Sequence, residues 1–244
     1  MKHLLLLLII VPATMYGQNY LGLGAHLGGF TRGGDWAELY GPAFETGGRV
    51  EYGMSNGLIL AAQGDVMFGQ NVKIDPISGL RNDVGVVTGD IVDEGVLADI
   101  SLLSRGYRAS LMAGYQHELN ENGIGLRGLI GPSYMSHFIR IQDDANQTTN
   151  NLRDEYKRGY DRKAGGFGVV GELGVQYAQP NGSYRMYFVV SGSLTSSKAL
   201  NSTQFDLLSV GPEDGTDLSI GGRVGMILGL FRNTTGEKAD DIYY

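Results

Sequence analysis

The chain has 244 residues, 26 acidic and 19 basic, for a formal net charge of −7, and it contains no cysteine. The acidic balance, with no basic cluster, argues against nucleic acid as a partner. Because cysteine is absent, we expect no disulfide framework, no thiolate metal site and no lipoprotein anchor.

Residues 1–17 have the pattern of a secretory signal peptide. A short basic start precedes an eight-residue apolar core at 4–11, and a small-residue cleavage region ends at Gly17. The apolar core is too short to span a bilayer. We therefore expect a mature chain that begins at Gln18 and carries a formal charge of −8, since Lys2 is removed.

Eight later segments alternate between apolar and polar side chains. A period of two places successive side chains on opposite faces, as in a strand with one apolar and one polar face. In chain order, the predicted strands cover 20–30, 43–52, 58–69, 107–116, 124–134 (with a possible extension to 141), 166–177, 184–194 and 217–231.

Short turns and long loops alternate between these strands. The short turns, 53–57, 120–123 and 179–182, each contain an Asn-Gly pair, which is a strong hairpin signal. The long loops are 31–41, 70–105, 142–163 and 196–216. An even number of such strands with this arrangement is typical of bacterial outer-membrane barrels. We therefore predict an all-β protein: an eight-stranded antiparallel up-and-down transmembrane β-barrel over 18–231. A periplasmic tail would follow at 232–244, with both mature termini in the periplasm.

Alternation alone leaves open a soluble, lipocalin-like barrel, which also has eight strands. The polar face favours the membrane barrel because its charges could pair inside a narrow lumen, and many strand glycines lie on the same face. The predicted lumen ion-pair network comprises Glu45, Arg49, Glu51, Asp65, Arg108, Arg127, Glu172, Arg185 and Arg223.

Aromatic residues on the apolar face form two rows. Those beside the short turns are Tyr52, Tyr115, Tyr177 and Tyr184, and those near the long loops are Phe44, Phe68, Tyr107 and Phe167. At a rise of roughly 3.3 Å per residue and a tilt near 40°, the two rows lie about 20 Å apart. The apolar band between the aromatic girdles of outer-membrane barrels is similar, at about 25 Å. We therefore expect the apolar face to contact outer-membrane lipid and lipopolysaccharide.

Eight strands leave room in the lumen for little besides side chains, so we expect a packed network, with a narrow channel as an alternative. A lipid- or peptide-directed hydrolase would depend on His137, near Ser133 and Ser136. No spacing supplies an orienting carboxylate. We therefore predict no catalytic site and interpret His137 as a polar residue at the barrel rim.

A metal site is the remaining chemical candidate. Asp143, Asp144 and Asn146 offer oxygen ligands, but they lack EF-hand spacing and its closing glutamate. We therefore expect neither a metal nor a cofactor.

The 70–105 loop is unusually apolar between Ile74 and Leu103. Loops of this length usually have a function, and an exposed apolar patch often marks an interaction site. Two interpretations remain open: the loop folds over the barrel mouth, extending the strands on either side, or it binds a partner.

Several motifs resemble those of the small outer-membrane β-barrels of Bacteroidetes, in the OmpA/OmpX-like superfamily. They are the Gly17-Gln18 junction, 137–141, 156–162, 223–225 and 242–244. The similarity covers roughly the C-terminal half and departs from the family at 226–229, where Trp and Pro are expected. The resemblance implies a barrel without an established enzymatic activity. Some such barrels are accessory subunits of envelope machines, including the type IX secretion apparatus. We expect envelope partners at the 70–105 loop or the tail.

Overall fold

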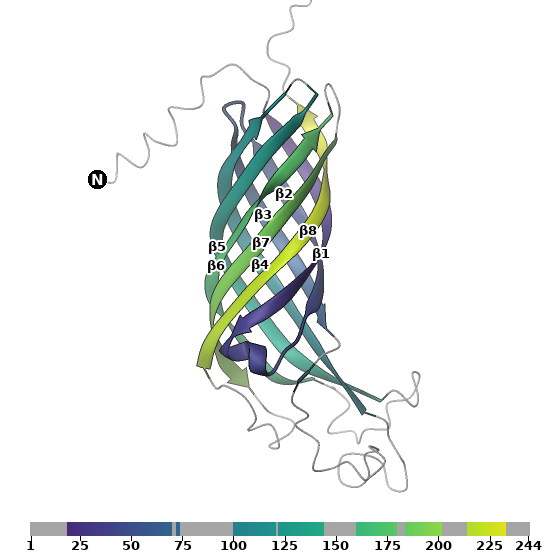
Figure 1. Cartoon of the computed structure of the whole chain (residues 1–244), viewed down its shortest axis with the longest axis vertical. Helices are drawn as coiled ribbons and strands as arrows, with labels where there is room; N and C mark the ends of the chain where they lie inside the picture. The colour runs from purple at the N-terminus through teal and green to yellow at the C-terminus, as the bar shows by residue number, and fades with distance from the viewer. Residues whose placement is uncertain are drawn as a thin grey trace, which may run out of the picture.

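In the computed structural model, the described residues are 19–69, 72–73, 100–120, 122–143, 160–179, 184–201 and 214–232. The predicted signal peptide, nearly all of the predicted tail and most of the 70–105 loop lie outside these residues. Within them, eight antiparallel strands follow one another around a closed ring, and the last pairs with the first (Figure 1). The predicted all-β, eight-stranded, up-and-down barrel is therefore confirmed.

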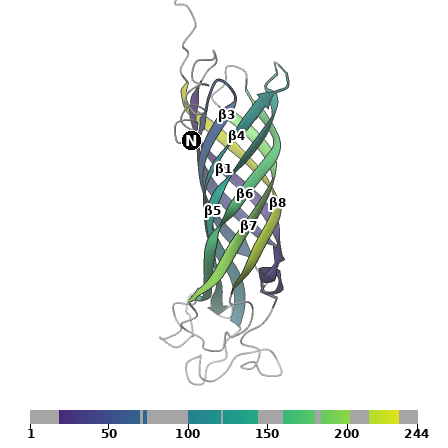
Figure 2. The ribbon, with the colours of Figure 1, turned by 90° about the vertical axis from the view of Figure 1, so that its left-hand side faces the viewer.

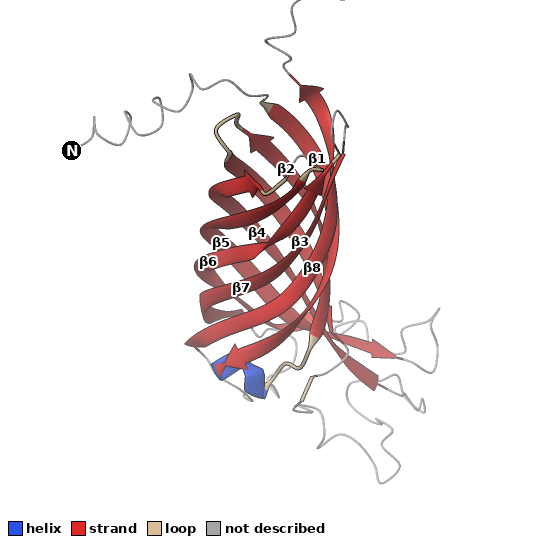
Figure 3. Ribbon diagram, turned by 45° about the horizontal axis from the view of Figure 1, so that its top comes forward, coloured by secondary structure: helices blue, strands red, loops and turns tan. Residues whose placement is uncertain are grey.

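The strands are β1 (Tyr20–Gly34), β2 (Ala43–Gly53), β3 (Leu58–Gly69), β4 (Ile100–Glu118), β5 (Ile124–Asp143), β6 (Tyr160–Ala178), β7 (Tyr184–Asn201) and β8 (Asp214–Arg232), with one 3₁₀ helix, η2 (Asp35–Glu38). No helix among the described residues is long and apolar enough to cross a membrane. The strands tilt around a tall cylinder (Figure 2). We call the end with the β2–β3 and β4–β5 turns the turn end. The opposite end, where η2 lies, is the loop end (Figure 3).

Glycines at the two described short turns are required by backbone geometry. Gly57 and Gly123 have φ values of 90° and 84°, which side-chain-bearing residues rarely adopt. A Cβ on Gly123 would also lie 1.8 Å from the carbonyl oxygen of Ala178. The Asn120 side chain accepts a hydrogen bond from the backbone N–H of Ile124 at 3.0 Å, which fixes the β4–β5 turn.

Several strands are longer than predicted. β4 starts at Ile100, β7 reaches Asn201, and β8 starts at Asp214. Parts of all four predicted long loops are therefore strand, including residues 100–105. The backbone ladder continues through polar pairs such as Lys198 with Asp214. Apolar alternation stops earlier because the part of a strand that extends beyond an apolar environment needs no apolar face. The alternation pattern therefore underestimates strand length.

The two faces of the barrel wall differ sharply in chemistry. Large apolar side chains such as Leu111, Ile130 and Leu173 are exposed on the outside, each 64–69 % accessible. Inside, the barrel holds charged and hydroxyl side chains together with glycines. A small apolar cluster that includes Ile59 and Val170 is also buried there. This arrangement is the reverse of a soluble barrel, whose apolar face points inward.

Candidate functional site

Glu172 lies at the centre of a buried ion-pair network in the lumen. Arg49 donates two hydrogen bonds to its carboxylate, at 2.8 and 2.6 Å. Arg127 and Arg223 each reach it at 3.4 Å from other strands. A single carboxylate from β6 therefore joins guanidinium groups from β2, β5 and β8.

A second part of the network lies around Glu45 and Asp65. Arg108 donates to Glu45 at 2.6 Å and to Asp65 at 3.0 Å. Arg223 donates to Glu45 at 2.9 Å, so it bridges this part to Glu172. The imidazole Nε2 of His26 lies 2.7 Å from the Asp65 carboxylate. Arg108 and Asp65 are register partners on adjacent strands, whereas the other contacts cross the lumen between strands that are not neighbours.

Glu51 completes the network towards the turn end. Arg127 donates to it at 2.6 Å, and the Tyr20 hydroxyl donates at 2.5 Å. The ring of Tyr187 packs against the guanidinium groups of Arg49 and Arg127, at 5.0 and 4.6 Å. Four carboxylates thus face four arginines in one connected, buried cluster. Formal charge is balanced there, as burial of ionised groups requires.

The structure brings together eight of the nine residues predicted for this network. Arg185 differs: it is half-buried near the turn end, donates to the Gln116 side chain at 3.0 Å and stacks over Tyr20 at 3.7 Å. Arg185 is the second residue of β7 and so lies nearer the turn end than the four carboxylates of the network. The predicted set also lacks Gln63 and His26, although both lie on the predicted polar face and contact Asp65.

The predicted girdle residues lie on the outer wall. Seven are exposed, and Tyr184 is half-buried beside Tyr177, with ring centroids 6.4 Å apart. Towards the loop end, Phe44 pairs in register with Phe68. Exposed aromatic rings at both ends of an apolar wall are typical of proteins anchored at membrane interfaces.

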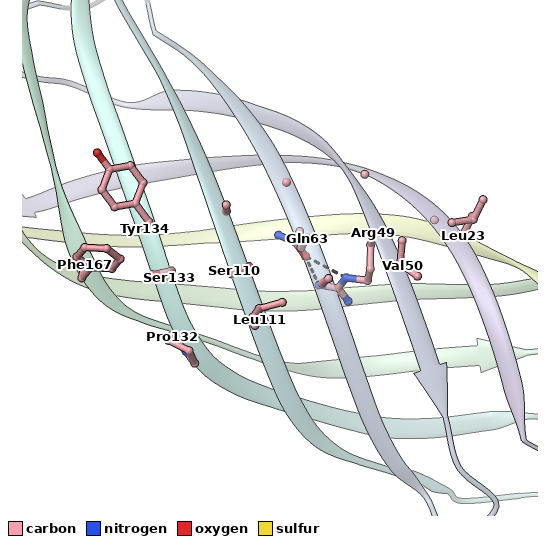
Figure 4. A pocket seen from close by; sticks show the side chains of 15 residues that line it. Leu23, Arg49, Val50, Gln63, Ser110, Leu111, Pro132, Ser133, Tyr134 and Phe167 are labelled. Carbon is pink, nitrogen blue, oxygen red and sulfur yellow. Dashed lines mark hydrogen bonds between the residues drawn. The ribbon is translucent and has the colours of Figure 1, made fainter.

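A groove of about 780 Å³ crosses the outer wall from β1 to β6 (Figure 4). Its floor includes Gly48, Gly64 and Ala109, which are neighbours in register on three adjacent strands. Leu111 and Phe167 form part of its walls. The lining is almost entirely apolar, so the groove suits a lipid chain or the side chains of another membrane-spanning protein.

The segment between β1 and β2 packs against β5 at the loop end. Trp36 and Tyr40 from this segment are fully buried and contact the ring of His137, with centroid distances of 4.6 and 4.9 Å. Beneath them, Arg32 donates to Asp217 at 2.7 Å. The alternation pattern does not predict this cluster, although Trp36 is the single tryptophan of the chain.

His137 lies towards the loop end of β5, as a rim position requires, and it is fully buried under Trp36 and Tyr40. Its Nδ1 lies 3.6 Å from Asp217 and 3.4 Å from Arg32. The Ser136 hydroxyl donates instead to the backbone carbonyl of Ala164, at 3.1 Å. The described residues contain no group of three or more histidine or acidic side chains placed to hold a metal ion. Residues 144–146 lie outside that range.

No family model matches the sequence, and no curated protein matches it. Among solved structures, the chain is similar to Ail, the attachment invasion locus protein of Yersinia pestis, at 11 % identity and a TM-score of 0.36, covering 87 % of this chain and 99 % of that one. A major outer membrane protein from Thermus thermophilus has 14 % identity and a TM-score of 0.37, with coverages of 84 % and 99 %. The outer membrane protease OmpT from Escherichia coli has 13 % identity and a TM-score of 0.26, with coverages of 87 % and 96 %. The likeness is one of barrel architecture, and the resemblance to Bacteroidetes barrels stays a prediction.

Proposed function

We propose that this chain is a structural outer-membrane barrel that serves as an accessory subunit of a larger envelope complex, such as the type IX secretion machinery. The observation that carries the proposal is the lumen, where four arginines and four carboxylates interlock across the barrel. A lumen filled in this way offers neither a wide path for solutes nor an open site for a reaction.

The outer wall supports the membrane part of the proposal. Large apolar side chains cover it, and aromatic rings lie towards both ends of the apolar band. A closed barrel has no strand edge, so all of its ladder groups are paired in lipid. We place the turn end in the periplasm, as in bacterial barrels with short periplasmic turns. The secretion-machinery assignment rests on the family resemblance alone.

Purification from native membranes in a mild detergent tests the accessory role. We expect the barrel to elute in an assembly larger than one 26.3 kDa chain with its micelle, together with other envelope proteins. The matched control is the same chain refolded from a denatured state, which has no native partner and should elute as a monomer. A native preparation that elutes like this control would count against the proposal.

A narrow channel is the competing function, and planar-bilayer recording separates the two. We expect no steady conductance from the reconstituted barrel, because the Glu172 and Glu45 clusters obstruct the lumen. Reproducible single-channel steps that disappear without the protein would establish the channel instead.

The outer groove is the contact that we propose for a membrane-spanning partner. A Cβ added at Gly64 would meet no atom within 4 Å, so this glycine is not required by packing inside the barrel. We expect Gly64→Leu to leave the thermal stability of the isolated barrel unchanged or slightly raised, because leucine fits a strand better than glycine. The same change should reduce the amount of partner that co-purifies.

Gly222→Leu is a matched control, because Gly222 is also exposed, is open to an added Cβ and does not line the groove. It should leave co-purification unchanged. If Gly64→Leu also leaves the complex intact, the partner binds elsewhere, and the 70–105 loop and the tail become the sites to test.

A further inference from the structure

Residues 34–41, which join β1 to β2, fold back over the loop end of the barrel, and we call them the plug. They contain η2, which lies at the barrel end in Figure 3. Trp36, Leu39 and Tyr40 are each at most 1 % exposed. A connection between two strands is usually exposed and polar, so burial of three large side chains in eight residues is unusual. The plug therefore buries a large apolar surface at the loop end.

The plug covers a polar cup formed by Arg32, Asp217 and His137. Arg32 donates to Asp217 at 2.7 Å, and its guanidinium group stacks under the Tyr40 ring at 4.8 Å. The ring of Trp36 packs edge-on against His137. The plug side chains thus contact the groups that they shield from solvent.

Several polar atoms in and beside the cup have no hydrogen-bond partner among the described residues. Five buried atoms of the described residues have no partner: Arg32 Nε and Nη2, Asp217 Oδ1, and the hydroxyl oxygens of Thr195 and Ser197. Thr195 is the register partner of Asp217 on the adjacent strand. Buried polar groups without partners favour any state in which water reaches them. The seated plug therefore gains apolar burial and loses polar hydration.

Glycines lie at both ends of the plug, and an exposed hydrogen bond joins it to β8. Gly33 and Gly34 precede its 3₁₀ helix, and Gly41 ends it, before Pro42. Gly34 has a φ of 72°, a conformation open mainly to glycine. The Asp35 carboxylate accepts a hydrogen bond from the Thr216 backbone N–H at 2.8 Å, at an exposed position.

On the opposite side, Lys73 donates to two plug carbonyls, those of Ala37 and Leu39, at 2.7 and 2.8 Å. The hydrogen bonds of Asp35 with Thr216 and of Lys73 with Ala37 are exposed, and solvent can replace exposed hydrogen bonds at little cost. Flanking glycines supply the backbone freedom that a hinge needs.

We propose that the plug is a gate that exchanges between this seated state and a lifted state in which water reaches Arg32 and Asp217. The gate controls access to the polar cup rather than passage through the barrel, because the ion-pair network below it is tied to the strands and not to the plug. The plug and the cup both lie within the described residues, and the gate requires no partner protein.

The chain is well suited to a test, because Trp36 is its single tryptophan and it has no cysteine. A Cβ built on Gly215 lies 2.8 Å from the Cβ of Asp35, and a disulfide needs about 3.8 Å. A small local shift therefore lets the double variant Asp35→Cys, Gly215→Cys lock the plug to β8. Acrylamide quenching of Trp36 fluorescence in detergent micelles reports whether the plug lifts.

We expect measurable quenching in the wild-type protein and in the reduced double variant, a several-fold drop on oxidation and recovery with a reductant. Asp35→Cys alone, treated with the same oxidant, should show no drop. Asp35→Ala, which removes the tie to Thr216, should increase quenching without needing a disulfide. Wild-type protection equal to that of the oxidised variant, or no increase in Asp35→Ala, would show a fixed plug and overturn the proposal.

Discussion

Replacing Glu172 with glutamine is expected to lower the free energy of unfolding by about 3–5 kcal/mol. The change keeps the shape of the side chain and removes its charge. Arg49 then loses its carboxylate partner at 2.6 Å, and Arg127 and Arg223 each lose one at 3.4 Å. The lumen is left with one uncompensated positive charge in a site closed to solvent, and that desolvated charge is the main cost.

Urea titration of the barrel reconstituted in vesicles measures this loss, with the shift of the folded band on unheated gels as a second readout. Lys198→Gln is the control, because Lys198 is exposed near the loop end and a surface charge typically contributes at most about 1 kcal/mol. Glu45→Gln, at the other centre of the network, should resemble Glu172→Gln. A loss for Glu172→Gln no larger than that of Lys198→Gln would mean that water penetrates the lumen and screens the network.

Most of this network could be predicted because a strand has a fixed period of two. Once Arg49 and Glu51 are assigned to the polar face, both must point into the same lumen. Alternation does not give the position of a side chain along the barrel axis, and it does not identify the strand that the side chain contacts across the lumen. Arg185 shows this limit, since it shares the face of the network but pairs with Gln116 instead of a carboxylate.

The plug could not be predicted from the pattern. Its side chains belong to a segment without alternation, and Trp36 contacts His137, about a hundred residues away in the chain. The cup beneath it also joins distant residues, Arg32 and Asp217. Such contacts depend on how the ring closes, which places β1 beside β8. A single tryptophan between glycines was the available signal, and it identifies no partner.

The outer groove was missed for a related reason. Gly48 and Gly64 are recognisable as small residues in predicted strands, but the hollow exists because register aligns them with Ala109. Register between strands is set by turn geometry and by pairing along the whole ladder, which short local patterns do not fix. A shift of two residues in one strand would place a larger side chain in that row and fill the hollow.

Leu111→Arg is expected to destabilise the barrel in a bilayer by about 2–4 kcal/mol, the cost of an arginine at mid-depth on the lipid-facing wall. Leu111 is 65 % exposed and lies four residues from both Tyr107 and Tyr115, at the middle of the apolar band. In a bilayer, exposure there means contact with hydrocarbon, where a guanidinium group loses its hydration. Folding yield into phosphatidylcholine vesicles and urea titration of the folded product both measure the effect.

Tyr115→Arg is the depth control, because Tyr115 lies on the same strand and face but at the edge of the band, where arginine costs about 0–1 kcal/mol. The difference between the two variants isolates depth in the membrane from charge alone. If both variants fold equally well and the chain stays monomeric in buffer without detergent, the exposed apolar wall faces water. The soluble-barrel interpretation would then replace the membrane one, and the proposed partner contact would lose its physical basis.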